Sequence, residues 1–458
     1  MRLLFILLLF ATSYRALGAR SPFYFKIDKP HKAQVLHSGI QALQVRLDLI
    51  EKAKSTIDLE AYILNKSKSS RLILQALSKK VKAGVRVRIL YDGGNHIKYD
   101  DSDFALLSKT FDLKIFNLKK KIRPIKNLGR NHRKLLIVDG KKAILGGRNN
   151  SDYYFELGSS FNFVDREILI EGELPSKLVK NFEAFFYSKM AKRFKGKSSS
   201  FRGSDLLTEK AEDLKLKALV ANESATKEVL MHTCDKVEFI SDIPSRSVLL
   251  RRLIIPYRNR VKLINSFVAK KSLEAKKSID IEQAYLIALS HTKRLIKKVL
   301  KKGVKINILT NSFLNNDTKL LNPILDKQLE KFSRHKNFNA YQMNGPYTDE
   351  YEDVLNPDST WATHSKTIVF DEKSTIFGSY NLDSISRLNN TELIMLCHSK
   401  KVAKTVLDSI KLRSMKAWKI DPDSEFRSGE PLYDSLTQSE RKLYKRLLIP
   451  LSLLKTFL

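Results

Sequence analysis

The feature that most constrains this chain is a short pattern that occurs twice, once in each half of the sequence. The pattern is a His, a Lys two residues later and an Asp five residues after the Lys: His132-x-Lys134-x4-Asp139 and His364-x-Lys366-x4-Asp371. Seven residues after each Asp comes a second shared element, Gly146-Gly147-Arg148-Asn149 or Gly378-Ser379-Tyr380-Asn381. One copy would be weak evidence in a Lys-rich chain, but two copies with identical spacing indicate a duplicated functional element.

The spacing within each copy predicts a β-strand followed by a tight turn. A His and a Lys two residues apart point to the same face of a strand. Asp139-Gly140 is a strong turn signal, and the residues after it predict a returning strand. The small residues that end this strand let backbone approach a phosphate, and residues 150–152 and 382–384 offer N-caps for a following helix that would favour an anion. Imidazole, ammonium and carboxamide groups would then meet one phosphate, as metal-free cleavage through a phosphohistidine requires.

The duplication extends beyond the motif. Residues 55–60 are echoed by 277–282, Ala61-Tyr62 by Ala284-Tyr285, and 82–90 by 301–309. Each half predicts a strand, a helix ended by Gly84 or Gly303, and a second strand. Such a βαβ unit favours a mostly parallel sheet.

The paired motifs resemble the HKD signature of the phospholipase D superfamily, over about residues 55–410. The resemblance implies an α/β fold of two pseudo-symmetric phospholipase D-like halves, each a mostly parallel sheet flanked by helices, which share one active site. It also implies that one His attacks phosphorus while the other protonates the leaving alcohol and then activates the incoming water or alcohol. By resemblance we assign attack to His132 and the acid–base role to His364.

The resemblance also assigns the other site residues. The catalytic residues are His132, Lys134, Asp139, His364, Lys366 and Asp371; the phosphate-binding residues are Gly147, Asn149, Ser379 and Asn381; the histidine-orienting acids are Asp165 and Glu392. The lysines and asparagines would hold the non-bridging oxygens, whose charge grows in the transition state. Asp139 and Asp371 lie beyond direct reach along the strand, so we expect them to support the motif structurally. The first copy departs from the family pattern at Gly147, where a Ser is common.

A narrower resemblance concerns the substrate. The run 146–149 followed by Asp152-Tyr153-Tyr154-Phe155 is similar to bacterial cardiolipin synthases, as are residues 90–94 and 163–165. It implies phosphatidyl transfer, in which a glycerol hydroxyl of a second phospholipid resolves the phosphohistidine. Water would give hydrolysis from the same intermediate, and only its exclusion separates the two outcomes.

The net charge of the chain indicates anionic partners. Lys and Arg outnumber Asp and Glu by 83 to 49, which gives a formal charge of +34. An acidic lipid surface and a nucleic acid both suit this charge. The leading hypothesis is a phosphatidyltransferase or phospholipase D acting on phospholipid at an anionic membrane surface, as a monomer with a pseudo-dimeric site. The alternatives are an exported phosphodiesterase or endonuclease on nucleic acid, and an inactive basic binding module.

The ends of the chain and its composition shifts predict the domain boundaries. Residues 1–18 resemble a secretory signal, with an uncleaved membrane anchor as the alternative. The first half is predicted at 19–195, a linker at 196–232, the second half at 233–425 and an apolar tail at 426–458. The protein is therefore expected to be exported (periplasmic or secreted), or peripheral on the membrane through its N-terminal segment.

A few further residues carry expectations. Cys234 and Cys397 are the only cysteines, and we expect two buried thiols rather than a bridge. No metal or other cofactor is expected, because no zinc-type or calcium-type ligand spacing occurs. Trp361 lines a substrate pocket or packs in the core. Glu60 and Glu282 face the shared cleft or, with the register shifted by one residue, point away from it.

Overall fold

The computed structural model describes most of both halves of the chain. The described residues are 22–94, 101–116, 129–194, 205–227, 229–244, 263–343, 356, 358–383, 386–387, 389–420, 437–439 and 441–442. The predicted signal segment and most of the predicted tail lie outside this set.

The fold consists of two α/β halves, each built on a nine-stranded sheet. In spatial order the first sheet contains β10 (Ala191–Arg193), β5 (Asp112–Phe116), β4 (Arg86–Asp92), β3 (Thr56–Ala61), β6 (Leu135–Val138), β7 (Lys142–Gly146), β9 (Glu167–Glu171), β2 (His31–Leu36) and β11 (Met231–Cys234). The second contains, in the matching order, β20 (Trp418–Lys419), β15 (Phe338–Met343), β14 (Lys305–Asn311), β13 (Ser278–Gln283), β17 (Lys366–Phe370), β18 (Ser374–Gly378), β19 (Leu393–His398), β12 (Lys236–Ser241) and β1 (Tyr24–Ile27). The two pseudo-symmetric α/β halves are thus confirmed.

The direction of the strands corrects the expectation of mostly parallel sheets. Only β3–β4 and β4–β5 are parallel in the first sheet, and only β13–β14 and β14–β15 in the second. The other neighbours in both sheets run antiparallel. Helical crossovers produce the parallel pairs, whereas the motif strands return through tight turns, which pair strands antiparallel.

Helices cover the outer faces and the junction of the two sheets. They are α2 (Gly39–Glu51), α3 (Lys68–Lys82), α4 (Asp101–Thr110), α5 (Leu174–Phe186), α6 (Ala211–Ala225), α8 (Leu263–Glu274), α9 (Ser290–Lys301), α10 (Asn322–Ser333) and α12 (Lys400–Met415). Gly84 and Gly303 follow α3 and α9 with φ of 83° and 81°, the left-handed conformation that ends a helix. Helix α6 lies within the predicted linker and packs on α2 and α3.

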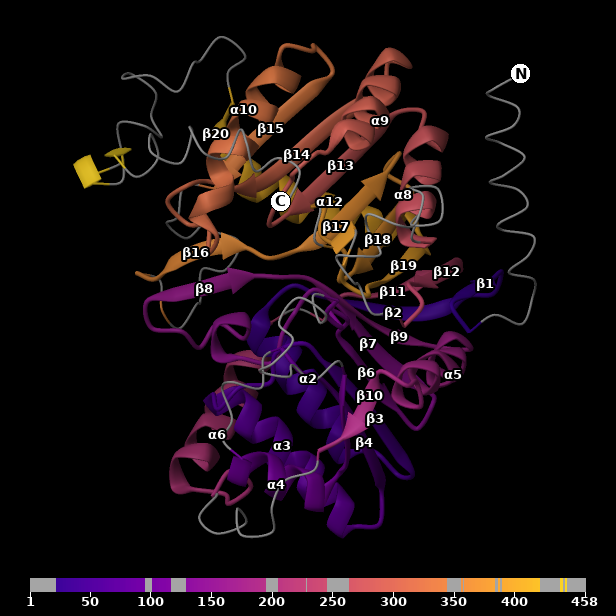
Figure 1. Ribbon diagram of the computed structural model, residues 1–458, viewed down its shortest axis with the longest axis vertical. Helices are drawn as coiled ribbons and strands as arrows, with labels where there is room; N and C mark the ends of the chain where they lie inside the picture. The colour runs from indigo at the N-terminus through magenta and orange to yellow at the C-terminus, as the bar shows by residue number, and fades with distance from the viewer. Residues whose placement is uncertain are drawn as a thin grey trace.

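One hydrophobic core runs through the junction of the halves. It contains residues of α5 and the first sheet together with residues of α12 and the second sheet. Figure 1 shows the first half below and the second half above, with β8 (Phe161–Val164) and β16 (Thr360–Thr363) side by side between them. Trp361 on β16 is fully buried in this core, so it packs there rather than lining a pocket.

The two sheets exchange their outermost strands. Strand β1 comes just before β2 in the chain but pairs with β12 in the second sheet, while β11 comes just before β12 but pairs with β2 in the first sheet. The predicted domain boundaries stay a prediction, and this exchange crosses them.

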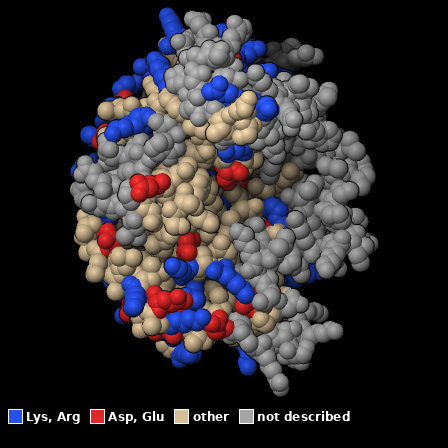
Figure 2. Space-filling view, turned by 90° about the vertical axis from the view of Figure 1, so that its left-hand side faces the viewer, with Lys and Arg blue, Asp and Glu red and all other residues tan. Residues whose placement is uncertain are grey.

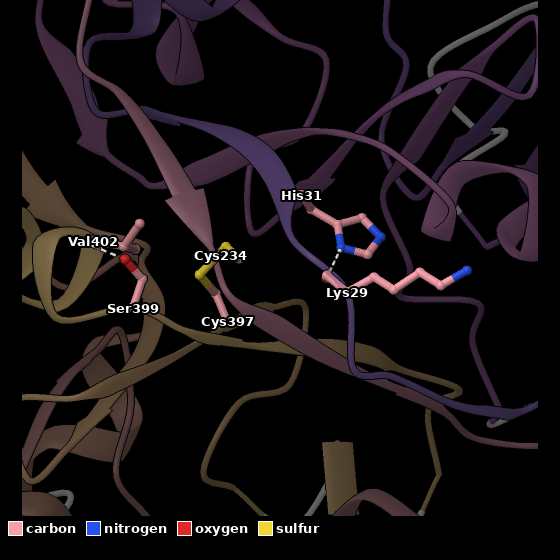
Figure 3. Close-up of a disulfide and its surroundings, with 6 residues drawn as sticks. All are labelled: Lys29, His31, Cys234, Cys397, Ser399 and Val402. Carbon is pink, nitrogen blue, oxygen red and sulfur yellow. Dashed lines mark hydrogen bonds between the residues drawn. A yellow bond between two sulfur atoms is a disulfide. The ribbon is translucent and has the colours of Figure 1, made fainter.

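A disulfide joins the sheets at the exchange and corrects the expectation of free thiols. Cys234 on β11 is bonded to Cys397 on β19, with the Cα atoms 5.3 Å apart (Figure 3). Both residues are fully buried. The expectation failed because both cysteines fall within the predicted second half, whereas the pairing of β11 with β2 places Cys234 in the first sheet, at bonding distance from Cys397 in the second.

Candidate active site

The backbone places each motif His against the opposite half of the protein. The His132 N–H donates to the Thr391 carbonyl at 3.0 Å, and the His364 N–H donates to the Val164 carbonyl at 2.7 Å. Each His lies just before the strand, β6 or β17, that begins the motif hairpin. Both histidines therefore sit at the junction of the halves, and both are almost fully buried.

The carboxylates that contact the histidines also come from the opposite halves. His132 Nδ1 lies 3.0 Å from Glu392 Oε2, and His364 Nδ1 lies 2.6 Å from Asp165 Oδ2. A carboxylate accepts the hydrogen bond, so each Nδ1 donates and each Nε2 keeps its lone pair. Each motif His therefore depends on a carboxylate of the other half.

The two motif lysines lie in the same buried environment. Lys134 Nζ donates to the His132 carbonyl at 2.7 Å, and Lys366 Nζ donates to that of His364. Burial lowers the pKa of Lys134 to about 7 and that of Lys366 to about 8, each partly offset by nearby carboxylates. Lys366 further lowers the pKa of Lys134 and of His132, as expected for groups that share one pocket.

Burial also lowers the pKa of both histidines, but to different extents. For His132 the Glu392 carboxylate opposes the effect of burial. The pKa of His364 is lowered well below its usual value by burial and by the cations Lys366 and Lys134. Burial thus favours the neutral form of both imidazoles.

Two buried asparagines that follow the motif hairpins have unused hydrogen-bonding capacity. Asn149 and Asn381 follow β7 and β18 and are nearly fully buried. Within the described part of the chain, neither Oδ1 atom has a hydrogen-bond partner. Because an unpaired buried polar group is costly, these amides fit a site that a polar ligand completes.

Gly147 and Ser379, the predicted phosphate contacts, each lie against the carboxylate that binds a motif His: Gly147 against Asp165 and Ser379 against Glu392. Ser379 Oγ donates to Glu392, so its hydroxyl supports the acid rather than standing free. At Gly147 a Cβ atom would lie 2.4 Å from Asp165 Oδ1. The Arg166 N–H donates to that oxygen at 2.7 Å, in place of a serine hydroxyl. The departure from the family pattern therefore makes room for Asp165.

The motif aspartates act on the backbone. Asp139 accepts from the N–H groups of residues 54–56, and Asp371 from those of residues 276–278. Both have φ of 52° in the tight turn of the motif hairpin. These bonds lower the pKa of Asp139 to about 2 despite opposing desolvation. The two carboxylates tie each motif strand to the start of the adjacent β3 or β13.

The segment after the first motif does not form the expected helix. Residues Asp152–Tyr154 make a single 3₁₀ turn. The Asp152 carboxylate instead accepts from Ser69 N, at 2.8 Å, and from Lys68 N, at the start of α3. Asp152 therefore caps the start of α3 instead of a helix of its own segment. The 3₁₀ turn at Asp152–Tyr154 is too short to provide the anion site expected there.

Glu60 and Glu282 bind residues next to the motif histidines. Glu60 Oε1 accepts from Asn131, at 2.7 Å, and the carboxylate pairs with Arg133. Glu282 accepts from Arg166 at 2.7 Å and from Thr363 at 2.9 Å. Both glutamates are buried and contact a residue next to a motif His. They are therefore part of the scaffold.

Aromatic rings beside the histidines escaped the sequence analysis. The Tyr62 ring lies 4.6 Å from the ring of His132, and the Tyr154 and Phe163 rings lie 4.9 and 5.2 Å from that of His364. These residues had entered the sequence analysis only as parts of the internal repeat or of the family resemblance, not as site residues. Within the described residues, no group of three or more His, Cys, Asp or Glu is arranged to hold a metal ion.

The comparisons with known proteins agree with this geometry. A family model described as "Cardiolipin synthase, PLD-like domain" matches residues 47–188 and 271–412. Cardiolipin synthase C of Escherichia coli is 27% identical over 406 residues, covering 81% of this chain and 82% of that protein. An uncharacterised protein of Helicobacter pylori is 28% identical over 421 residues, covering 86% and 81%.

A solved structure shares the fold. The crystal structure of phosphatidylserine synthase from Haemophilus influenzae aligns with a TM-score of 0.66 and 13% sequence identity, covering 98% of this chain and 100% of that one. The chain belongs to the phospholipase D superfamily, in the family of cardiolipin synthase PLD-like domains, and is an enzyme of the phosphatidyltransferase or phosphodiesterase class.

Proposed function

We propose that the protein is a phosphatidyltransferase of the cardiolipin synthase type, which works through a phosphohistidine. The observation that carries this proposal is the crossed pair of His–carboxylate contacts beside two buried lysines. A phosphodiester that reaches both imidazoles meets a nucleophile on one side and a proton donor on the other. The cardiolipin synthases among the relatives support a phospholipid as the substrate.

The reaction has two displacements at the same phosphorus. In the first, Nε2 of one neutral imidazole attacks phosphorus and the P–O bond to the leaving alcohol breaks. The other motif His, which is protonated at this stage, gives its proton to that oxygen. In the second displacement this imidazole takes the proton of an incoming glycerol hydroxyl, whose oxygen forms a bond to phosphorus as the N–P bond breaks. Lys134 and Lys366 would stabilise the non-bridging oxygens at both steps.

The order of the two histidines follows the resemblance, which assigns attack to His132 and the acid–base role to His364. The hydrogen bonds are symmetric between the two, because Glu392 supports a cation on His132 and Asp165 supports one on His364. Trapping the intermediate under alkaline denaturing conditions and mapping the labelled peptide separates the two orders.

The location proposed is outside the cytoplasm, at a membrane surface. A buried disulfide is typical of proteins that fold in an oxidising compartment. Among the residues that the structure describes, no helix is both long and apolar enough to cross a bilayer. On the face seen in Figure 2, Lys and Arg are interspersed with Asp and Glu over the lower part.

The test is direct turnover by the purified protein. Vesicles of phosphatidylglycerol and phosphatidylethanolamine are incubated with the enzyme, and the products are measured by mass spectrometry. Cardiolipin is the expected product, while phosphatidic acid alone would indicate a hydrolase. Cleavage of single-stranded DNA without lipid turnover would support the endonuclease alternative instead. Both His132→Ala and His364→Ala should abolish turnover, whereas the exposed Asp408→Asn on α12 is the matched control.

A further inference from the structure

One edge of the pocket breaks the symmetry of the two halves. The strand registers match Glu60 with Glu282, so Ala284 takes the place of Tyr62 and Tyr285 takes that of Ile63. The repeat seen in the sequence is therefore displaced by one residue at this point. Tyr285 Oη donates a hydrogen bond to the carboxylate of Asp317. A site with two similar halves can distinguish the phospholipid donor from the acceptor only where the halves differ. The Tyr285–Asp317 pair is such a difference.

The loop that carries Asp317 is fastened to the strand that leads into His364. Asn311, at the end of β14, accepts from Thr363 N at 2.7 Å and donates to Thr363 O at 2.8 Å. Asn315 Nδ2 donates to the Trp361 carbonyl at 2.7 Å. These two asparagines are buried, whereas Asp317 is exposed. The fold thus fixes a solvent-facing carboxylate on the His364 side of the site.

Asp317 lies within electrostatic reach of the reacting groups. Its carboxylate opposes the effect of burial on Lys366, raising the pKa of that ammonium group. It also raises the pKa of Tyr154, whose ring contacts His364 at 4.9 Å. Asp317, held by Tyr285, therefore lies on a loop fastened to the strand before His364 and acts electrostatically on groups around that His.

The chemistry of the pair fits a hydroxyl rather than a second anion. A carboxylate beside a phosphate pocket repels another phosphate but accepts a hydrogen bond from a neutral hydroxyl. We propose that Asp317, held by Tyr285, binds a polyol acceptor through the hydroxyl next to the one that attacks phosphorus. The attacking oxygen forms the new P–O bond, the N–P bond breaks, and its proton goes to the acid–base imidazole. The hydroxyl on Asp317 keeps its proton. This inference rests on the proposed phosphatidyl transfer.

The test compares an acceptor that has neighbouring hydroxyls with one that has a single hydroxyl. Glycerol and propan-1-ol are offered separately with a phosphatidylethanolamine donor in vesicles, and the yields of phosphatidylglycerol and phosphatidylpropanol are measured. In Asp317→Asn and Tyr285→Phe, we expect the preference for glycerol over propanol to fall about tenfold, as loss of a hydrogen bond to a charged group predicts. Asp408→Asn should keep the wild-type preference. The assay is run at pH 6.5, where Lys366, with a pKa of about 8, stays charged.

The outcomes separate this inference from the proposed function. If the wild type transfers to both alcohols and Asp317→Asn keeps the same preference, the acceptor subsite is overturned. Equal losses with both alcohols would also overturn it, since Asp317 would then act only through Lys366. If the wild type shows no lipid turnover at all, the proposed function itself fails.

Discussion

The disulfide between the exchanged strands allows a quantitative prediction about stability. The bond joins residues 163 positions apart, so it closes most of the second half into a covalent loop. The loop-entropy relation gives a stabilisation of roughly 5 kcal/mol for a loop of this size. A chain of 458 residues has an unfolding entropy of about 1 kcal/mol/K. We therefore expect Cys234→Ala/Cys397→Ala to melt about 5 °C lower than the oxidised wild type.

The assay is a thermal melt followed by circular dichroism, with and without a reductant. The reductant should lower the melting temperature of the wild type, once the buried bond is reached, and leave the double variant unchanged. Peptide mapping without reduction should recover the Cys234–Cys397 pair. Equal melting temperatures for the oxidised and double-variant proteins would refute the loop argument. Recovery of two alkylated thiols from unreduced protein would refute the bond itself.

Three further predictions concern the active site. We expect Glu392→Gln and Asp165→Asn each to lower kcat by a factor of about 10² to 10⁴, because each removes the charged partner of a His in the other half; a variant with more than a tenth of wild-type kcat would contradict this role. The free enzyme should lose kcat/KM as the pH rises through about 7 to 8, since Lys134 and Lys366 are charged below these pKa values and neutral above them; an unchanged profile in Lys134→Arg would show that this lysine does not set the alkaline limb. Gly147→Ser should inactivate the enzyme, because its Cβ would lie 2.4 Å from the Asp165 carboxylate; normal kcat and a normal melting temperature would count against the close approach.

The sequence predicted the local pieces of the site well. The resemblance carried by the repeated spacing around His132 and His364 implied a shared site, and the structure places both residues at the junction, with Lys134 and Lys366 beside them. The motif hairpin was predictable from local sequence, because Asp139-Gly140 is a turn signal between two apolar runs and both residues have positive φ.

Long-range relations were not predictable from one sequence. Spacing along the chain cannot tell whether Asp165 meets the His of its own half or that of the other. The partner of Cys234 depended on an exchange of strands between sheets, and the pairing direction of the outer strands depended on short returns that periodicity does not reveal. Strand register decided that Glu60 and Glu282 bind buried neighbours instead of facing the cleft.

Because each His binds a carboxylate of the other half, separation of the halves would inactivate the enzyme. If the two halves separated even slightly, His132 would leave Glu392 and His364 would leave Asp165 together. The loosened protein would then be inert, since no single half retains a working nucleophile or proton donor. An enzyme built in this way cannot leave behind an active fragment.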